Sequence, residues 1–406
     1  MRIASDFFKR NRKILTDRLP QGTAVFIFAG GPRPMSRDDD YRFLVDRDFY
    51  YLTGLEIQNA KFILTNEREY LFVPYPDEMK ERWHGRRMTK KEASSISGIS
   101  EDDILDINDF DTKEYEILTE KKLSPAYDGL SITEESVRFA KDKTGATDIG
   151  EILTKMRMVK TPEEVDAIRE AAKITEAALR EMKEQIREGA TEIDLYTALD
   201  YGMSRRGSLI PAFTTISAIG DNAFYLHHGD PEGEEGPKVT KGCQIQIDVG
   251  ARYNGYCADI SRVYFYKRTD DKDDRRLQLH ELITLLRKKC WETIRPGITF
   301  DDLNREIRAV CGVWLCAHNV LHEGYTDEDV KRYYWHNTGH HLGLDVHDVS
   351  IREMAFEKGN CLAIEPGVYI PEWHTGFRIE DDVLVTEDGC ELISSGDDGL
   401  DGIIVL

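Results

Sequence analysis

The chain of 406 residues carries 54 Lys and Arg against 75 Asp and Glu, which gives a formal net charge of −21. This length allows two or three domains with hydrophobic cores of their own. The negative charge argues against binding to nucleic acid or to an anionic membrane, because phosphate groups would repel the chain. No apolar run reaches the length of a transmembrane helix or of a signal-peptide core, and the seven cysteines are scattered without a CxxC pair. We therefore expect an acidic cytoplasmic protein with reduced thiols.

Short apolar runs, each ended by turn residues, dominate the first part of the chain. Residues 23–30 (TAVFIFAG), 61–65 (KFILT) and 69–74 (EYLFVP) are typical of buried strands in an α/β layer. These runs predict a small α/β domain, which we assign to residues 1–152. The remainder, residues 153–406, is predicted to form a second domain.

A long helix is predicted near the start of the second domain. Thr161 is a suitable N-cap, Pro162 suits the first helical position, and Glu164 completes a capping box. Apolar residues then recur at helical spacing, and Gly189 is expected to end the helix. The apolar positions on the shared face are Val165, Ile168, Ala172, Leu179, Met182 and Ile186.

The second domain contains an internal repeat, in which three segments return in the same order. The pairs are IREGATEIDL (186–195) with IRPGITFDDL (294–303), KGCQIQIDVG (241–250) with KGNCLAIEPG (358–367), and, more weakly, LHHGD (226–230) with HHLGLD (340–345). This order predicts a duplicated domain with a pseudo-twofold axis. Matching acids from the two halves, Asp248 and Glu365, could then meet near that axis.

The segment IQIDVGARYNGYCADISRVYF alternates apolar and polar residues around the Asn-Gly pair at 254–255, a strong hairpin signal. With this pair as the loop, Asp248 lies opposite Ser261, and Asp259 lies opposite Gly250. Both aspartates are then on one face of the hairpin, roughly 7–8 Å apart between backbones. A solvated strand face is the simpler interpretation of one such aspartate. Two of them repel each other unless a cation lies between them.

Two further carboxylates favour a metal site over a solvated strand. Glu365 stands in the repeat at the position of Asp248, and Glu380 belongs to the alternating strand FRIEDDVLV, on the face shared with Arg378. Four carboxylates on strands of one duplicated sheet predict two divalent cations, which would neutralise them. Oxygen ligands with an imidazole favour Mn(II), Co(II), Fe(II) or Zn(II) over a metal that prefers thiolates.

Histidines cluster in the segment HNTGHHLGLDVHD, as His336, His340, His341 and His347. Alone, a glycine-containing loop rich in histidine is equally consistent with a surface segment. Beside four carboxylates, it is expected to provide the nitrogen ligand and the proton-transfer groups.

Together, these motifs resemble the pita-bread metallopeptidases, and within them the aminopeptidase P and prolidase branch, which cleaves Xaa–Pro bonds. DYRFLVDRDFYYLTGLE and ERWHGRR resemble the N-terminal domain of that branch. IDVGARYNGYCADISRVY, HNTGHHLGLDVHD, IEPGVYI and RIEDD resemble its catalytic domain. The resemblance implies an α+β fold, in which an internally duplicated pita-bread (creatinase/aminopeptidase-like) catalytic domain follows a smaller α/β domain of the aminopeptidase P type.

The resemblance also implies a site for two divalent metal ions per chain, with Mn(II) as the first expectation. Asp248 would bind one metal through both oxygens, while Asp259 and Glu380 would bridge or touch both metals. His340 and Glu365 would complete the shell of the other metal.

Catalytic and substrate-binding roles follow from the same resemblance. His227 and His347 would flank the substrate and steady the scissile carbonyl and the oxyanion. His336 would line the pocket on the proline side, and Arg378, counted with the substrate-binding residues, would hold an acidic ligand in place. General two-metal chemistry gives a bridging hydroxide as the nucleophile, and we expect Glu365 to shuttle its proton to the departing nitrogen.

The implied function is hydrolysis of the Xaa–Pro bond at the N-terminus of peptides that carry proline at the second position. One alternative is a prolidase, which cleaves only Xaa–Pro dipeptides and would need a basic group such as Arg352 for the free carboxylate of proline. Two further alternatives are a peptidase of broader specificity and a catalytically silent binding protein on the same fold.

Trp83 lies in ERWHGRR, where a large aromatic side chain stands among charges. Its structural interpretation is a half-buried side chain that anchors a surface helix. In the family that the chain resembles, an aromatic residue of the equivalent stretch can close the pocket of a neighbouring subunit. We therefore expect a homo-oligomer, a dimer or larger, in which Trp83 helps to form the substrate site.

Overall fold

The structure is a computed structural model. The residues that it describes are 2–19, 21–110, 116–119, 147–266 and 274–394. The chain divides into two compact units, Met1–Met156 and Arg157–Leu406. No helix in the described part of the chain is long and apolar enough to cross a membrane.

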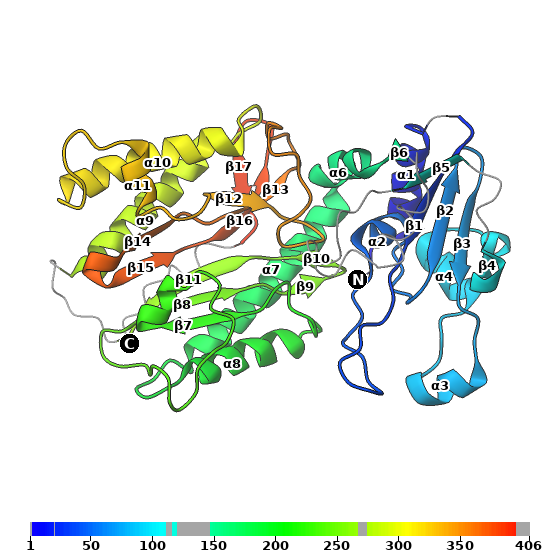
Figure 1. Cartoon of the computed structure of the whole chain (residues 1–406), viewed down its shortest axis with the longest axis horizontal. Helices are drawn as coiled ribbons and strands as arrows, with labels where there is room; N and C mark the ends of the chain where they lie inside the picture. Colours follow the sequence, from blue (N-terminus) through cyan, green and yellow to red (C-terminus); the bar gives the residue numbers. More distant parts are fainter. Residues whose placement is uncertain (1, 20, 111–115, 120–146, 267–273, 395–406) are drawn as a thin grey trace. The chain divides into compact units, whose positions relative to one another are not determined.

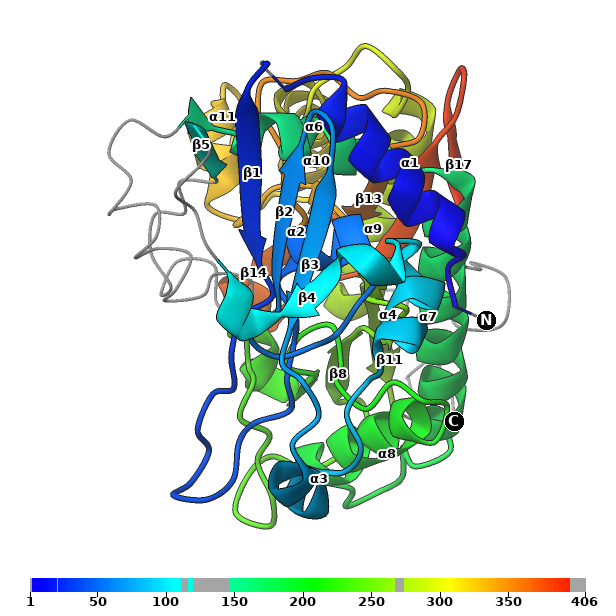
Figure 2. The ribbon, with the colours of Figure 1, turned by 90° about the vertical axis from the view of Figure 1, so that its right-hand side faces the viewer.

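The N-terminal unit is built on a mixed sheet whose central strands are those predicted from the apolar runs (Figure 2). The strands are β1 (Thr23–Phe28), β2 (Lys61–Thr65), β3 (Glu69–Val73), β4 (Ile104–Asp106), β5 (Glu116–Thr119) and β6 (Thr147–Asp148). Their order is β4-β3-β2-β1-β5-β6, with antiparallel pairing among β1, β2 and β3 and parallel pairing towards both edges.

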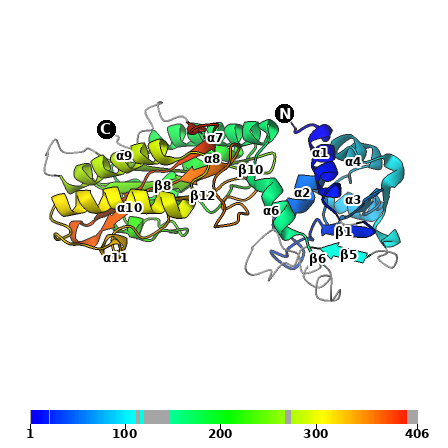
Figure 3. The ribbon, with the colours of Figure 1, turned by 90° about the horizontal axis from the view of Figure 1, so that it is seen from above.

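Helices α1 (Ser5–Thr16), α2 (Arg47–Thr53) and α4 (Lys90–Ser97) lie on one face of this sheet (Figure 3). Helix α3 (Glu78–His84) has no buried residue and lies beyond the end of the sheet (Figure 2). Phe7, Phe8 and Tyr51 of α1 and α2 are buried and meet edge to face. The predicted α/β layer is therefore present, with its apolar strands inside.

The C-terminal unit consists of two similar layers, each a pair of helices packed on an antiparallel sheet (Figure 1). The first layer contains α7 (Pro162–Lys183), α8 (Glu192–Ser204), β7 (Ile216–Ile219), β8 (Gln244–Val249) and β11 (Ile260–Phe265). The second layer contains α9 (Arg275–Thr293), α10 (Phe300–Ala317), β12 (Gly339–His341), β13 (Cys361–Ile364), β16 (Asp381–Val385) and β17 (Cys390–Leu392). The smaller elements of this unit are η3 (Gly220–Phe224), β9 (Arg252–Tyr253), β10 (Tyr256–Cys257), α11 (Asp327–Lys331), β14 (Gly367–Ile370), η4 (Pro371–Trp373) and β15 (Thr375–Arg378). Helix α6 (Gly150–Met158) begins in the N-terminal unit and ends in the C-terminal one.

Helix α7 begins as predicted, after Thr161 and with Pro162 at its first position. The Glu164 carboxylate accepts a hydrogen bond from the Thr161 N–H at 2.8 Å and another from the Tyr256 hydroxyl at 2.8 Å. This buried acid therefore caps the helix and joins it to the following hairpin. The predicted end at Gly189 is wrong, because the chain leaves the helix at Lys183 through tighter turns.

The duplication is visible in the matching elements of the two layers. Helices α8 and α10 both begin with a capping box, made by Thr191 with Asp194 and by Thr299 with Asp302. Strands β8 and β13 occupy equivalent places, each paired on both sides by antiparallel neighbours. The third repeated pair, LHHGD with HHLGLD, does not occupy equivalent places, so this part of the predicted repeat is wrong. LHHGD follows β7 and η3, whereas HHLGLD begins within β12, the strand equivalent to β7.

The hairpin between β8 and β11 has the predicted register. Asp248 pairs with Ser261, and the loop residues Asn254 and Gly255 both have positive φ, at 47° and 82°. Gly250 lies at a close approach of the two strands of this hairpin. A Cβ at this position would lie 1.9 Å from the Ala258 carbonyl oxygen, so glycine is needed for the two backbones to approach.

All seven cysteines of the chain belong to the C-terminal unit, and none forms a disulfide. Four of them, Cys257, Cys290, Cys311 and Cys361, are buried. Burial raises the pKa of both Cys311 and Cys361 to about 12. These thiols are therefore protonated at neutral pH and shielded from reagents in solution.

Candidate metal centre and active site

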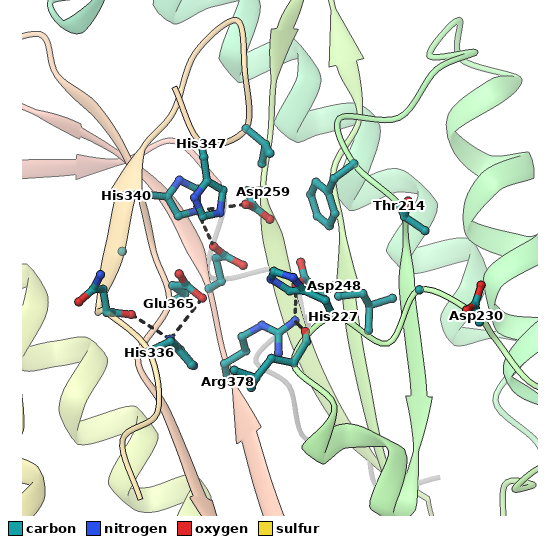
Figure 4. Close-up of a pocket in the computed structure, with 18 residues that line it drawn as sticks. Thr214, His227, Asp230, Asp248, Asp259, His336, His340, His347, Glu365 and Arg378 are labelled. Atoms are coloured by element: carbon teal, nitrogen blue, oxygen red, sulfur yellow. Dashed lines mark hydrogen bonds and ion pairs between the residues drawn. The ribbon is translucent and has the colours of Figure 1, made fainter. Parts of the chain in front are cut away.

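Side chains from both layers of the C-terminal unit line a pocket of about 650 Å³. Figure 4 shows their polar ends directed into this common space. The predicted site residues that line the pocket are His227, Asp248, Asp259, His336, His340, His347, Glu365, Arg378 and Glu380. The structure thus brings together residues that lie more than 150 positions apart in the sequence, because the duplicated layers face each other across the pocket.

Three of the predicted metal ligands offer atoms that all lie within 4.8 Å of one another: Asp259, His340 and Glu380. His340 Nε2 lies 3.4 Å from Asp259 Oδ2 and 3.9 Å from Glu380 Oε1. Burial, reinforced by the nearby Asp248, raises the pKa of Asp259 well above its ordinary value. Burial and Asp259 raise the pKa of Glu380 in the same way. These acids can all be ionised at neutral pH only if a cation joins them.

Two carboxylate oxygens in the pocket indicate that a cation fits there. Asp248 Oδ1 and Asp259 Oδ1 are buried, and neither has a hydrogen-bond partner among the described residues. A buried charged oxygen without a donor is costly, whereas a bound cation would satisfy it. Carboxylate oxygens with one imidazole suit borderline divalent cations better than metals that need thiolates. The residues present therefore fit a divalent metal centre.

The Arg378 guanidinium holds Asp248 on strand β8. It donates a hydrogen bond to Asp248 Oδ2 and another, at 3.1 Å, to the Leu226 carbonyl oxygen. The backbone N–H of Arg378 donates a further hydrogen bond to Gln246 Oε1 at 3.0 Å. Arg378 is buried, so this geometry is consistent with the predicted role of holding an acidic ligand in place.

The prediction that FRIEDDVLV is one alternating strand is wrong. Strand β15 ends at Arg378 and β16 begins at Asp381, so Glu380 lies in the connection between them. Its N–H donates to the Ser261 carbonyl oxygen of the first layer at 3.1 Å, and the Ser261 hydroxyl donates to Glu380 Oε2 at 3.0 Å. The chain leaves its own sheet here because it bonds to the neighbouring layer, and this places Glu380 in the pocket.

Glu365 directly follows β13 and lies next to His336. His336 Nδ1 is 3.5 Å from Glu365 Oε2, and His336 Nε2 is 3.1 Å from the Tyr369 hydroxyl. A Cβ on Gly367 would lie 2.5 Å from His336 Nε2, so the glycine in IEPGVYI makes room for this imidazole. The proximity of an acid and an imidazole suits the transfer of a proton.

Two histidines of the second layer stack in the pocket. The rings of His340 and His347 lie 3.7 Å apart between centroids and are nearly parallel, at 12°. Burial, with His340 and His227 nearby, lowers the pKa of His347 to about 4. His347 is therefore neutral at pH 7 and can donate one ring N–H. His227 reaches the same pocket from the loop after η3 and is exposed.

Two residues discussed for the site lie on the surface. Trp83 is on α3 and is 80% exposed, so its side chain is not the half-buried anchor of the structural interpretation. Its predicted role at a neighbouring subunit stays a prediction. Arg352 is also exposed and lies 3.3 Å from Asp301.

Sequence reasoning missed several residues that shape the pocket. Its wall includes the apolar Phe213, Ile216 and Leu226, and also Thr214 and Asp230 (Figure 4). No motif marks Phe213 or Ile216, since their neighbours come from the fold, whereas Leu226 and Asp230 are the two ends of the LHHGD segment. The sequence did contain a signal for Gln246. It is a polar residue between apolar ones on the strand of Asp248, which places it on the same face as that aspartate.

Comparison with protein-family models gives two matches. Residues 166–387 match the model of "Metallopeptidase family M24". Residues 8–124 match the model of "Aminopeptidase P, N-terminal domain". Together they cover most of both compact units.

Similar proteins span nearly the whole chain. The chain is 28% identical to an Xaa-Pro aminopeptidase of Escherichia coli, with 97% of this chain and 95% of that protein covered. It is 31% identical to an Xaa-Pro dipeptidase of Pyrococcus furiosus, but over only 61% of this chain and 66% of that protein. Among solved structures, Pseudomonas aeruginosa aminopeptidase PepP matches with a TM-score of 0.85 and 27% identity, over 98% of this chain and 96% of that one. E. coli aminopeptidase P with the inhibitor Pro-Leu matches with a TM-score of 0.83 and 25% identity, over 98% and 96%.

Proposed function

The chain belongs to metallopeptidase family M24, and we propose that it is a metal-dependent Xaa-Pro aminopeptidase, which hydrolyses the Xaa–Pro bond at the N-terminus of peptides. The observation that carries this proposal is the convergence of Asp248, Asp259, His340, Glu365 and Glu380 on one pocket. The similarity to Xaa-Pro aminopeptidases over nearly the full length of both chains supports the substrate class.

We assign these five residues as the ligands of two divalent ions, with Mn(II) as the first choice and Co(II), Zn(II) or Fe(II) as alternatives. The clustered acids with raised pKa values and the unsatisfied oxygens of Asp248 and Asp259 support this assignment. When bound, the ions would supply Lewis-acid activation of water and of the scissile carbonyl.

The protein's own side chains then bind the peptide and move the proton. Glu365 would take a proton from the attacking water and deliver it to the departing proline nitrogen, and its 3.5 Å distance from His336 supports this role. The neutral His347 can donate its ring N–H to the oxygen of the scissile carbonyl as negative charge develops there. His227, across the pocket, can steady the same group. Arg378 keeps Asp248 oriented.

The leaving group explains what such a pocket must recognise. The nitrogen of an Xaa–Pro bond has no hydrogen, so the enzyme must fit the ring of proline and has no amide proton to bind. His336 lines the pocket and presents its ring for this purpose, while the buried Tyr369 holds that ring through a hydrogen bond of 3.1 Å. We therefore propose that His336 borders the proline subsite.

Assays with defined peptides test the proposal. The protein is loaded with Mn(II), Co(II) or Zn(II) and incubated with an Xaa–Pro dipeptide, an Xaa–Pro–Yaa tripeptide and a tripeptide without proline. Release of the first residue from the tripeptide that contains proline, abolished by a chelator, is expected. Equal cleavage of all three would favour a peptidase of broader specificity, and no cleavage would favour a silent binding protein.

The prolidase alternative has support from the similarity to the P. furiosus dipeptidase, which covers only part of the chain. The basic group considered for it, Arg352, is 76% exposed in its side chain and does not line the pocket. Cleavage of the dipeptide but not of the tripeptide would establish this alternative.

We also propose that Trp83 completes the pocket of a neighbouring subunit in a homo-oligomer, and that residues 1–152 and 153–406 are the two domains. The exposure of Trp83 supports the first point, because an aromatic side chain without cover is suited to a partner. The seven free thiols support a cytoplasmic location.

A further inference from the structure

One loop of the first layer carries several pocket residues but has little regular structure of its own. It runs from the end of β7 through η3 to residue 232, and it brings Leu226, His227, Gly229 and Asp230 into the pocket. His227 itself is exposed and forms none of the hydrogen bonds that hold this loop among the described residues. Its position must therefore depend on other parts of the loop.

The carboxylate of Glu192 gathers this loop around one point. Glu192 is the first residue of α8 and is fully buried. Its Oε1 accepts hydrogen bonds from the Ile219 N–H at 2.7 Å and from Asn222 Nδ2 at 3.0 Å. Its Oε2 accepts from the Glu232 N–H at 2.9 Å and faces His228 Nε2 at 2.8 Å. One side chain thus holds the beginning, the middle and the end of the loop.

The link to His227 runs through the adjacent residue. His228 Nε2 faces a carboxylate, so this nitrogen carries the proton and donates it. The ring of His228 is also loosely stacked with that of Tyr225, with 6.3 Å between ring centroids and 30° between planes. His228 is therefore fixed in position, and the backbone that it shares with His227 is fixed with it.

A metal-binding role explains this cluster less well. Glu192, His228 and Glu232 offer ligand atoms within 4.8 Å of one another. Both oxygens of Glu192 and His228 Nε2 already take part in the hydrogen bonds above, and Glu232 Oε1 accepts from Asn222 at 3.1 Å. A metal would have to break this network, whereas the loop geometry depends on it.

We propose that Glu192 and His228 are positioning residues that hold His227 at the substrate. This inference rests on the proposed function, in which His227 steadies the scissile carbonyl. Neither residue lines the pocket, so each acts through the loop. Displacement of a group by about 1 Å can cost up to about 10²-fold in rate, so the network has a measurable effect on turnover.

The test compares His228→Ala, Glu192→Gln and the conservative His228→Gln, which keeps an N–H donor for Glu192. In the fully metal-loaded enzyme, His228→Ala and Glu192→Gln should lower kcat about 10-fold or more with metal content unchanged. His228→Gln should retain most of the activity. Glu234→Gln, two residues beyond the loop and 85% exposed in its side chain, is the matched control and should behave as wild type.

A double-mutant cycle separates positioning from a general loss of structure. In a His227→Ala background, His228→Ala should cause almost no further loss of kcat, because its effect is exerted through His227. If the decreases in kcat of the two single mutants multiply in the double mutant, the proposal is overturned.

A spectroscopic readout makes the test independent of activity. The ring signals of His227 in NMR spectra of ¹⁵N-histidine-labelled protein, assigned by their absence in His227→Ala, should shift in Glu192→Gln, while those of His340 stay in place. Unchanged His227 signals would overturn the positioning role. Wild-type protein that cleaves no Xaa–Pro peptide would overturn the proposed function alone, since the spectra still report whether Glu192 positions His227.

Discussion

Replacement of Asp348 by Asn should destabilise the C-terminal unit strongly. The Asp348 carboxylate lies 2.6 Å from Arg157 Nη2 and 2.9 Å from Lys160 Nζ, and all three side chains are at most 3% exposed. Asn has nearly the same shape as Asp but carries no negative charge. Lys160 would then remain buried beside a neutral amide, and Arg157 would lose its shorter ion pair while it keeps the one with Asp345 at 3.4 Å. Solvent cannot screen them at this depth.

The size of the effect follows from the burial of the cluster. Loss of one partner of a buried ion pair costs about 3–5 kcal/mol. For a unit of this size, each kcal/mol shifts Tm by about 2–4 °C, so we expect a decrease of roughly 6–20 °C. Scanning calorimetry of the full chain measures this directly. Glu387→Gln removes the partner of Lys358 in an exposed ion pair and should leave Tm almost unchanged.

The pH dependence gives an independent check of the same reasoning. Burial alone would raise the pKa of Asp348, but Lys160 and Arg157 lower it to about 2, against an ordinary value of 3.8. Its stabilising contribution is therefore complete above about pH 4 and is lost as the pH falls towards 2. The difference in Tm between wild type and Asp348→Asn should shrink over that range. An unchanged Tm in the variant at pH 7, or a difference that does not depend on acid, would refute the argument.

The remaining predictions concern the site. After loading and dialysis, elemental analysis should find about two divalent ions per chain, and substitution of Asp259 by Asn should reduce this number; a fully active protein without metal would contradict the assignment. His227→Ala and His347→Ala should each lower kcat by about 10²-fold or more at unchanged metal content, because each removes a donor to the developing oxyanion; wild-type turnover in both would exclude these roles. Trp83→Ala should lower kcat/KM with Tm and metal content intact, and sedimentation should show a dimer or larger species; an active monomer would argue against a shared pocket.

Local sequence signals were sufficient to predict the hairpin of the first layer and its register. The Asn-Gly pair set the register, and the alternation placed Asp248 opposite Ser261, as the structure confirms. The repeat likewise matched Glu365 to Asp248, since β8 and β13 are equivalent strands. Turn type and the alternation of side chains along a strand depend only on residues that are close in sequence, so one sequence is enough to predict them.

Contacts between the two layers could not be predicted in this way. The break between β15 and β16 arises because Glu380 bonds to Ser261 of the other layer, and nothing within FRIEDDVLV marks it. Within the first layer, the loop network around Glu192 was not predictable either, because its partners lie 27 to 40 positions further along the chain. The acids and the role of Arg378 beside Asp248 were therefore predictable, whereas the bonds between Ser261 and Glu380 were not.

The distribution of the cysteines makes the two units separately observable. All seven thiols lie in the C-terminal unit, and four of them are buried. A thiol reagent therefore has no target in residues 1–156, and it can modify Cys311 or Cys361 only when the surrounding core opens. The rate at which these thiols are labelled therefore measures how often the core of the C-terminal unit opens. The measurement needs no engineered cysteine, and the N-terminal unit does not contribute to it.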